Sequence, residues 1–370
     1  MRGILADKAS GAPAITITRQ TIIECRSLWK IFGDRCDEAM RAISDHGASK
    51  LEVRDRFNCV VGVVDASFTV EEGEIFCIMG LSGSGKSTLI RHVNRLIEPT
   101  SGHVFIEGQD VNSLNARQLR GLRASKIGMV FQNMALMPHR TVLDNVAFAL
   151  EVRGLSKEER YTVARKALAA VDLEGWDGRY PDELSGGMQQ RVGLSRAIAA
   201  DPHILLMDEP FSALDPLIRR QLQDQFVQLA AKMKKTTLFI THDLDEAIRI
   251  GDRIAIMKDG ALVQIGTPEA IVTEPADDYV ADFVAGISNL HLVSASRVME
   301  PLDAYESRRG ALDRSLCPRA IPDDDLDRLA DLSIESDHPI IVEQDGKAVG
   351  VVSKRALLRG IQGHWDDQSA

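Results

Sequence analysis

The sequence predicts an α/β protein built around a mostly parallel, doubly wound sheet. Strand-like and helix-like segments alternate from about residue 21 to about residue 290, a pattern typical of parallel sheets covered by helices. Three short apolar runs indicate buried central strands, each followed by glycine or polar residues: Ile75 to Met79, Ile204 to Met207, and Thr237 to Thr241. Because open parallel sheets bind ligands beyond the carboxyl ends of their strands, we expect these three ends to converge on one site.

The length and composition are those of a multidomain globular protein. At about 150 residues per domain, the 370 residues predict two to three domains. The formal net charge of -10 argues against a general nucleic-acid-binding protein, which needs a basic surface, so we expect no nucleic-acid partner. The five cysteines are scattered without metal-ligand spacing, which favours a reducing compartment and no structural zinc. No run of 18 apolar residues occurs, so the sequence predicts neither a signal peptide nor a membrane-spanning helix.

Changes in local pattern divide the chain into three parts. We expect an N-terminal tail at 1–20, a main domain at 21–290 and a C-terminal accessory region at 291–370. Within the main domain, residues 34–59 are charged and helix-prone around a glycine, which predicts an inserted helical pair. A solvated surface excursion is the simplest interpretation of that insertion.

The first central strand leads into a phosphate-binding loop. The residues after it fit the pattern GxxxxGK[ST] between a strand and a helical segment: Gly80, Leu81, Ser82, Gly83, Ser84, Gly85, Lys86, Ser87 and Thr88. The glycines let successive backbone N–H groups point inward as a nest for phosphate oxygens, and the helix start adds the positive end of its dipole. We expect Lys86 to reach the β- and γ-phosphates of a nucleotide and Ser87 to bind Mg²⁺.

The second and third central strands lead into further candidate catalytic and metal-binding side chains. The second ends at Asp208, which is suited to hold the Mg²⁺ water shell, and at Glu209, a candidate general base for the attacking water. Such a pair in isolation is more often a helix cap, but the phosphate loop upstream favours the catalytic interpretation. The third strand ends at His242, which could hydrogen-bond a γ-phosphate or the water.

A second glycine-rich helix start lies between the phosphate loop and the carboxylate pair. It runs Leu184, Ser185, Gly186, Gly187, Met188, Gln189, and we expect its helix from Met188 to Ala200. This stretch resembles the LSGGQ-type signature of ABC ATPases, with Met188 in place of the usual glutamine. In that family the signature closes over the nucleotide of a partner subunit. The resemblance therefore implies a homodimer of ATPase subunits that sandwiches two ATP molecules.

Other motifs of ABC ATPases follow in family order. Gln132 resembles the Q-loop residue, implied as a further Mg²⁺ ligand and catalytic residue; Ser212 and Asp215 resemble the D-loop; and His242 resembles the switch histidine. Phe32 resembles the aromatic residue that stacks on adenine, although a core role is the alternative.

The resemblance implies a defined fold and chemistry. The fold is a P-loop NTPase of ABC ATPase type, with a parallel-sheet core, an antiparallel β subdomain and a helical signature subdomain. The chemistry is hydrolysis of ATP with Mg²⁺, in which Glu209, His242 and Gln132 are catalytic.

Several features favour a transporter subunit among ABC ATPases. The chain has one set of motifs, no coiled-coil arm and no second cassette, unlike DNA-repair and translation-type members. The segment Asn133 to Val146 resembles the importer segment on which a coupling helix of the membrane subunit docks; a buried apolar loop is the alternative. The insertion at 34–59 and the sequences around the phosphate loop and Q-loop resemble the quaternary-amine uptake branch, which imports glycine betaine, proline or choline.

That branch implies partners and a location. These are integral membrane permease subunits, a separate substrate-binding protein, and a peripheral position on the cytoplasmic face of the inner (plasma) membrane. The alternatives are a soluble ABC ATPase that regulates or remodels another assembly without a transport partner, and a nucleotide-dependent scaffold without turnover.

The C-terminal region predicts a small α+β unit. A helix with Leu326 and Leu329 on one face precedes a strand hairpin turning at Asp345 and Gly346, and Ser353 caps a last helix. This pattern resembles a single CBS motif at about 317–363. Such motifs normally pair, so residues 291–316 hold a degenerate half or two chains pair theirs; the unit is a ligand sensor or a plain dimerisation cap.

Overall fold

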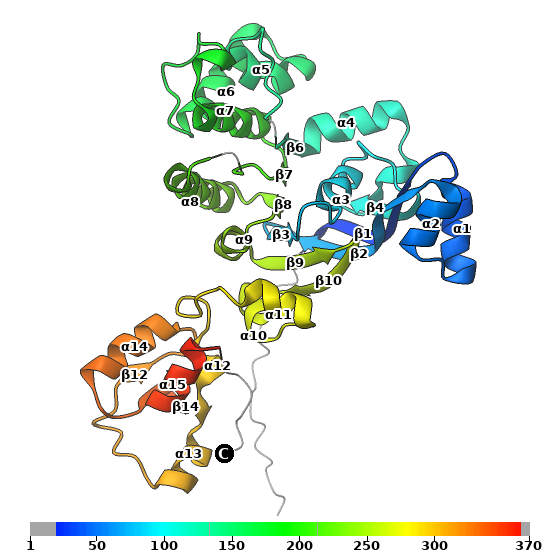
Figure 1. Ribbon diagram of the computed structural model, residues 1–370. Helices are drawn as coiled ribbons and strands as arrows, with labels where there is room; N and C mark the ends of the chain where they lie inside the picture. Colours follow the sequence, from blue (N-terminus) through cyan, green and yellow to red (C-terminus); the bar gives the residue numbers. More distant parts are fainter. Residues whose placement is uncertain (1–19, 133, 213, 364–370) are drawn as a thin grey trace, which may run out of the picture.

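The computed structural model of the chain describes residues 20–132, 134–212 and 214–363 (Figure 1). The expected N-terminal tail at 1–20 therefore lies almost wholly outside the described residues, as does Asn133 at the start of the expected docking segment. Within the described part, no helix is both long and apolar enough to span a bilayer.

A six-stranded sheet forms the core of the main domain, and its strand order is β10-β9-β3-β8-β7-β6. Neighbouring strands are parallel except for the antiparallel pair β9 and β10. The strand bounds are β3 Ile75–Met79, β6 Ile127–Val130, β7 Ile204–Asp208, β8 Thr236–Thr241, β9 Arg253–Lys258 and β10 Ala261–Gly266. The three predicted central strands are thus confirmed as the adjacent strands β3, β8 and β7, which places their carboxyl ends side by side.

The central strands are buried on both faces, as their unbroken apolar runs predict. In β3, Ile75, Cys77 and Met79 pack into one hydrophobic cluster, whereas Phe76 and Ile78 pack into another. The ring of Phe76 stacks on Phe68 at a centroid distance of 5.3 Å. This two-sided burial fixes the strand that delivers the phosphate loop.

An antiparallel four-stranded sheet covers one face of the core and has the order β2-β1-β4-β5. Its strands are β1 Thr21–Phe32, β2 Val60–Glu71, β4 Ser101–Ile106 and β5 Gln109–Asp110. Figure 1 shows a group of helices, α5, α6 and α7, at the end of the core sheet that is formed by β6. The helices of the main domain outside the insertion are α3 Lys86–Val93, α4 Ala116–Lys126, α5 Val142–Val152, α6 Lys157–Ala169, α7 Gly186–Ala199, α8 Pro216–Met233, α9 Leu244–Ile250, α10 Pro268–Thr273 and α11 Asp278–Val284, with 3-10 turns η1 Val111–Ser113 and η2 Pro181–Glu183.

The predicted helical pair is present between β1 and β2. It consists of α1 Cys36–His46 and α2 Lys50–Phe57. A Cβ added at Gly33 would stand 2.6 Å from Cys59 Sγ, so the chain enters and leaves the insertion at one point. The structure therefore shows a folded side element between the end of β1 at Phe32 and the start of β2 at Val60.

The C-terminal unit has its own sheet and hydrophobic cluster. The strand order is β11-β14-β13-β12, with bounds β11 Glu300–Pro301, β12 Arg319–Ala320, β13 Ile340–Gln344 and β14 Lys347–Val352. The helices are α12 Ala295–Val298, α13 Leu302–Arg309, α14 Leu326–Glu335 and α15 Lys354–Ile361. The helix, hairpin and final helix expected from the sequence are confirmed. Residues before 317 also contribute, because β11 pairs with β14.

Candidate functional site

The phosphate loop joins β3 to α3 and is tightly constrained by neighbouring backbone. Gly80 has φ +152, and a Cβ there would stand 2.1 Å from the carbonyl oxygen of Met257. Gly85 has φ +101, and a Cβ there would stand 2.3 Å from the carbonyl oxygen of Gly62. Only glycine fits both places, since other residues meet backbone and rarely adopt these torsions. The loop is therefore held in a defined curve on two sides.

Lys86 lies inside that curve. Its ammonium donates to the carbonyl oxygens of Gly80 at 2.8 Å and Leu81 at 3.0 Å, and its side chain is buried. Burial lowers the pKa of Lys86, and the carboxylates of Glu209 and Asp208 oppose this effect. A buried ammonium that donates to two neutral carbonyl oxygens is suited to bind an anionic partner.

Ser87 and Asp208 meet at the tip of β7. Ser87 Oγ donates to Asp208 Oδ1 at 2.7 Å, and the Asp208 side chain is fully buried. Arg91 Nη2 lies 3.2 Å from Asp208 Oδ2. Arg91 was missed by the sequence reasoning, although it follows Ser87 by four residues and so shares its face of α3. Hydroxyl and carboxylate oxygens side by side match the ligand preference of Mg²⁺.

Side chains that follow three neighbouring strands meet at Glu209. Gln132, two residues after β6, donates through Nε2 to Glu209 Oε2 at 3.2 Å. His242, directly after β8, places Nδ1 3.1 Å from the same oxygen. Glu209 itself has φ +48, uncommon for a residue with a side chain, and its N–H donates to Ile240 O at 3.0 Å. Backbone strain of this kind often accompanies functional positions. The expected convergence is therefore observed at a single carboxylate.

Phe32 lies at the end of β1 close to the phosphate loop. Its side chain is 40% exposed, and a Cβ on Gly62 would stand 2.9 Å from its ring. Because the Gly62 carbonyl also faces Gly85, the ring and the loop share one neighbour. Lys30 Nζ lies 5.1 Å from the ring centroid. An exposed ring beside a phosphate loop is suited to stack on a base.

The signature residues form the start of α7, two residues earlier than expected. Ser185 is the N-cap, and its oxygen accepts a hydrogen bond from the Met188 N–H, so α7 begins at Gly186 rather than Met188. In Figure 1, α7 groups with α5 and α6, apart from the phosphate-loop helix α3. A Cβ on Gly186 would meet nothing within 4 Å among the described residues. Packing within this chain therefore does not explain that glycine.

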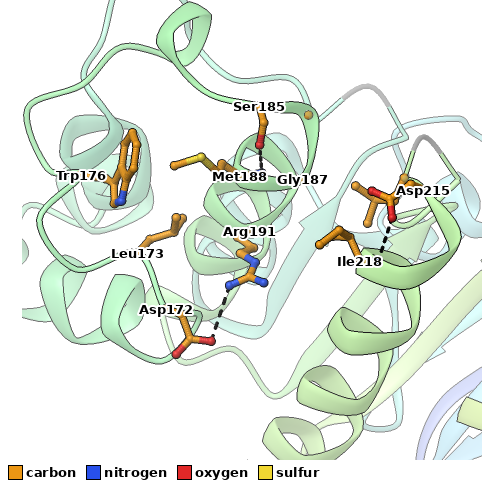
Figure 2. A pocket seen from close by; sticks show the side chains of 11 residues that line it. Asp172, Leu173, Trp176, Ser185, Gly187, Met188, Arg191, Asp215 and Ile218 are labelled. Atoms are coloured by element: carbon orange, nitrogen blue, oxygen red, sulfur yellow. Dashed lines mark hydrogen bonds and ion pairs between the residues drawn. The ribbon is translucent and has the colours of Figure 1, made fainter.

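A pocket of about 450 Å³ adjoins this helix start. Figure 2 shows Trp176 and Met188 on one side and Asp215 and Ile218 of α8 on the other. Asp215 is the N-cap of α8 and accepts from Ile218 N–H at 3.1 Å. The pocket thus brings together residues resembling the signature and the D-loop.

One D-loop residue also contacts the carboxylate site. Ser212 Oγ donates to the carbonyl oxygen of Glu209 at 3.1 Å. A displacement of Ser212 would therefore change the position of Glu209.

Two residues that sequence reasoning did not single out shape the segment after Gln132. Asn145 is fully buried; it accepts from Met137 N–H at 2.8 Å and donates to the carbonyl oxygens of Met137, Arg140 and Thr141. Arg196 of α7 donates to the carbonyl oxygens of Met134 and Ala135, and its burial lowers its pKa. This segment is therefore an organised loop tied to the signature helix.

Comparisons with known proteins show which family the chain belongs to. The ABC transporter family matches residues 63–212. The glycine betaine/proline betaine transport system ATP-binding protein ProV of Escherichia coli (strain K12) is 50% identical over 335 residues, covering 90% of this chain and 81% of that protein. This chain belongs to the ABC transporter family of ATP-binding proteins.

Other relatives of this ABC transporter protein extend the similarity. The glycine betaine/carnitine transport ATP-binding protein GbuA of Listeria monocytogenes serotype 1/2a (strain 10403S) is 53% identical, over 75% of this chain and 70% of that protein. The trimethylamine N-oxide transport system ATP-binding protein TmoW of Pelagibacter ubique (strain HTCC1062) is 47% identical, over 75% of this chain and 81% of that protein.

Solved structures show the same ABC cassette fold. A dimeric ATP-binding cassette in a post-hydrolysis state bound to ADP and Pi matches with a TM-score of 0.57 and 31% identity, over 67% of this chain and 99% of that chain. The α/β fold expected from the sequence is therefore confirmed as that of an ABC ATPase.

Proposed function

We propose that this ABC ATPase powers an importer of quaternary ammonium compounds and hydrolyses ATP at the site around Glu209. The observation that carries the proposal is the meeting of Gln132, Glu209 and His242 beside the Ser87–Asp208 pair. These groups lie at or just beyond the carboxyl ends of four neighbouring strands of one sheet, β3, β8, β7 and β6. Only the folded core sheet brings them together.

The phosphate loop supplies the binding end of the site. The backbone from Gly80 to Gly85 and the start of α3 bind the phosphates, with Leu81, Ser82, Gly83 and Ser84 forming the curve. Ser84 Oγ is buried without a hydrogen-bond partner among the described residues, which fits an acceptor supplied by the substrate. Lys86 exchanges its two carbonyl contacts for the β- and γ-phosphates, Thr88 continues the helix start, and Phe32 stacks on adenine.

The residues present also fit Mg²⁺. Ser87 and Asp208 already place two oxygen groups in contact, and Gln132 can add its amide oxygen. Mg²⁺ at nucleotide sites is commonly held by one or two carboxylates together with waters and substrate phosphates. When bound, Mg²⁺ neutralises charge that develops on the phosphates.

Hydrolysis depends on Glu209 as the group that polarises the attacking water. Its carboxylate is anchored between Gln132 and His242, which hold it at the strand ends rather than in solvent. His242 remains largely exposed, and in this proposal it hydrogen-bonds the γ-phosphate. A fixed base beside a fixed phosphate lowers the entropy cost of the water attack.

The signature completes a second chain's site. Gly186 and Gly187 leave backbone N–H groups at the start of α7, and Ser185 and Gln189 flank them. We propose a homodimer in which Ser185 to Gln189 of one subunit close over ATP bound to the other. The dimeric cassette matched in the structural comparison supports this arrangement. We propose that Ser212, which donates to the Glu209 carbonyl, and Asp215, which lines the pocket beside the signature, link the carboxylate site to the signature.

The transport role rests on the relatives. Their names specify glycine betaine, proline betaine, carnitine or trimethylamine N-oxide, all small molecules with a substituted nitrogen. The proposal includes membrane permease subunits that dock on the loop organised by Asn145 and Arg196, a separate substrate-binding protein, and a peripheral position at the cytoplasmic face of the inner membrane. The C-terminal unit is proposed to be a CBS-like accessory module at about 317–363 together with the elements that precede it.

Uptake measurements test this function. A strain that lacks the gene is complemented with the wild-type chain or with Glu209→Gln, and uptake of labelled glycine betaine, choline, carnitine and trimethylamine N-oxide is measured. We expect wild type, but not Glu209→Gln, to restore uptake of at least one compound, and the chain to co-purify with a polytopic membrane protein. No uptake and no membrane partner would favour a soluble regulator instead.

A further inference from the structure

The helical insertion is a rigid element, not a loose excursion. Ser49 and Glu52 form a capping box at the start of α2. Ala39 and Val53 are fully buried with Cys59 in a small hydrophobic cluster that also includes Ile31 of β1. Capping and burial both restrict the motion of α2 relative to β1. A displacement of α2 therefore also moves the residues that it contacts.

The insertion contacts the turn between β9 and β10 through one side chain. Lys50 Nζ, at the first position of α2, donates to the carbonyl oxygen of Asp259. The same Nζ would stand 3.4 Å from a Cβ on Gly260. Lys50 is the first residue of α2, so its stem is anchored by the helix, and burial lowers its pKa while Asp259 opposes this. Its contact crosses 209 positions of sequence.

That turn is bonded directly to the phosphate loop. Gly260 N–H donates to the carbonyl oxygen of Ser84 at 2.9 Å, and Gly260 O accepts from Val64 N–H at 2.8 Å. Asp259 and Gly260 have φ +47 and +83, so the turn is tight. Just before it, the carbonyl of Met257 blocks the space beside Gly80. The turn therefore supports the phosphate loop through the carbonyl oxygen of Ser84.

We propose that Lys50 is a positioning residue for the nucleotide site: it holds the β9–β10 turn against Ser84, so that the insertion sets the shape of the phosphate loop. This inference rests on the nucleotide-binding role proposed above. Along the chain, Phe32 precedes the insertion by two residues, and Gly62, whose carbonyl faces Gly85, follows it by three. The insertion therefore supports the site both where adenine is proposed to bind and where the phosphates are proposed to bind. Glu209 and His242 are not in this chain of contacts, so the effect falls on binding.

The test compares ATP affinity and turnover in variants of the full chain. For Lys50→Met, which keeps the apolar stem, we expect ATP binding to weaken about fivefold, the loss of roughly one hydrogen bond, with an unchanged rate at saturating ATP. Lys50→Arg should recover most of the affinity. Arg41→Ala is the matched control, because Arg41 donates to Asp37 O within its own helix, and it should bind ATP as wild type does.

Unchanged affinity in Lys50→Met, or an equal loss in Arg41→Ala, would overturn the proposal. A wild-type chain that fails to bind ATP would instead refute the nucleotide-binding role. A measurement without mutation guards against misfolded variants: ATP should slow amide hydrogen exchange in α2 and at Gly260. If ATP protects the phosphate loop but leaves α2 and Gly260 unchanged, the proposed coupling is wrong.

Discussion

At the scale of single residues, the site combines groups whose roles can be separated by conservative changes. Phe32 is the last residue of β1 and Glu209 follows β7, and the proposed site assigns them to different parts of a nucleotide. A Cβ added at Gly80 or Gly85 would collide with neighbouring backbone, so a substitution there would distort the loop instead of testing the role of a side chain. Side chains with one or two defined contacts give clearer tests.

Phe32→Ala should weaken ATP binding about tenfold, because stacking of a base on an aromatic ring contributes about 1–3 kcal/mol. Phe32→Tyr keeps the ring and should bind within about twofold of wild type. Titration with a fluorescent ATP analogue measures both. Equal affinity in the alanine and wild-type chains would assign Phe32 to packing against Gly62 alone.

Glu246 of α9 offers a prediction on pH. Burial raises the pKa of its carboxyl group, although hydrogen bonds from Thr241 and from Gln223 of α8 oppose the shift. A carboxyl group with a raised folded-state pKa weakens folding above that pKa, and the cost fades as pH falls through it towards the unfolded value. Glu246→Gln should therefore raise the thermal midpoint at pH 7, and the gain should shrink as the pH is lowered.

Asp245→Asn is the control for this change, since Asp245 is exposed on the same helix. Differential scanning calorimetry at several pH values measures both variants. A gain for Glu246→Gln that grows towards acid pH would show that the sign of the argument is wrong.

At the scale of elements, short apolar runs and capping residues carry most of the predictable structure. The strands β3, β7 and β8 follow from short runs of apolar and β-branched residues, and their shared edge follows from parallel topology. The start of α7 was placed two residues late because glycines are weak helix formers, whereas the Ser185 cap sets the boundary.

Long-range pairs could not be predicted in the same way. The contact of Lys50 with Asp259 and that of Arg196 with Met134 join segments that no local pattern relates. They depend on how the insertion and α7 pack, which the sequence pattern leaves open. Arg91 differs, because its spacing from Ser87 on α3 is a local signal.

Asn145 gives the element-scale prediction. Asn145→Leu keeps the volume but leaves the N–H of Met137 and the carbonyls of Met137, Arg140 and Thr141 without this partner. We expect a loss of about 2–4 kcal/mol in the free energy of unfolding, since each unsatisfied buried group costs about 1–3 kcal/mol.

Urea titration measures that loss. Val152→Ala on the same helix is the control, because Val152 is 62% exposed and should change the free energy by less than about 0.5 kcal/mol. An unchanged midpoint for Asn145→Leu would mean that the loop does not depend on these bonds.

At the scale of the whole molecule, the protein has an ATPase body and a C-terminal unit with a separate hydrophobic cluster. Ion pairs and hydrogen bonds link the two: Ser294 donates to Glu269 of α10, and Arg297 pairs with Glu274. The sequence predicted the helices and hairpin of the C-terminal unit but not the strand β11, which is two residues long and has no local signature.

Assembly gives the whole-molecule prediction. A chain that binds but does not hydrolyse ATP, such as Glu209→Gln, should sediment as a monomer alone and as a dimer with ATP. Adding Ser185→Arg, which places a bulky cation at the start of α7, should prevent that dimer while ATP still binds. ATP-dependent dimers in the double variant would mean that the signature does not contact the partner's nucleotide.

The most direct test of the account is the rate of Mg²⁺-dependent ATP hydrolysis by Glu209→Gln, measured beside its ATP affinity. Glutamine keeps the size of Glu209 and removes the base, so we expect wild-type affinity and turnover lowered by about 10²–10⁴-fold. Near-normal turnover with intact binding would contradict the assignment of Glu209, and with it the site on which the proposed function depends.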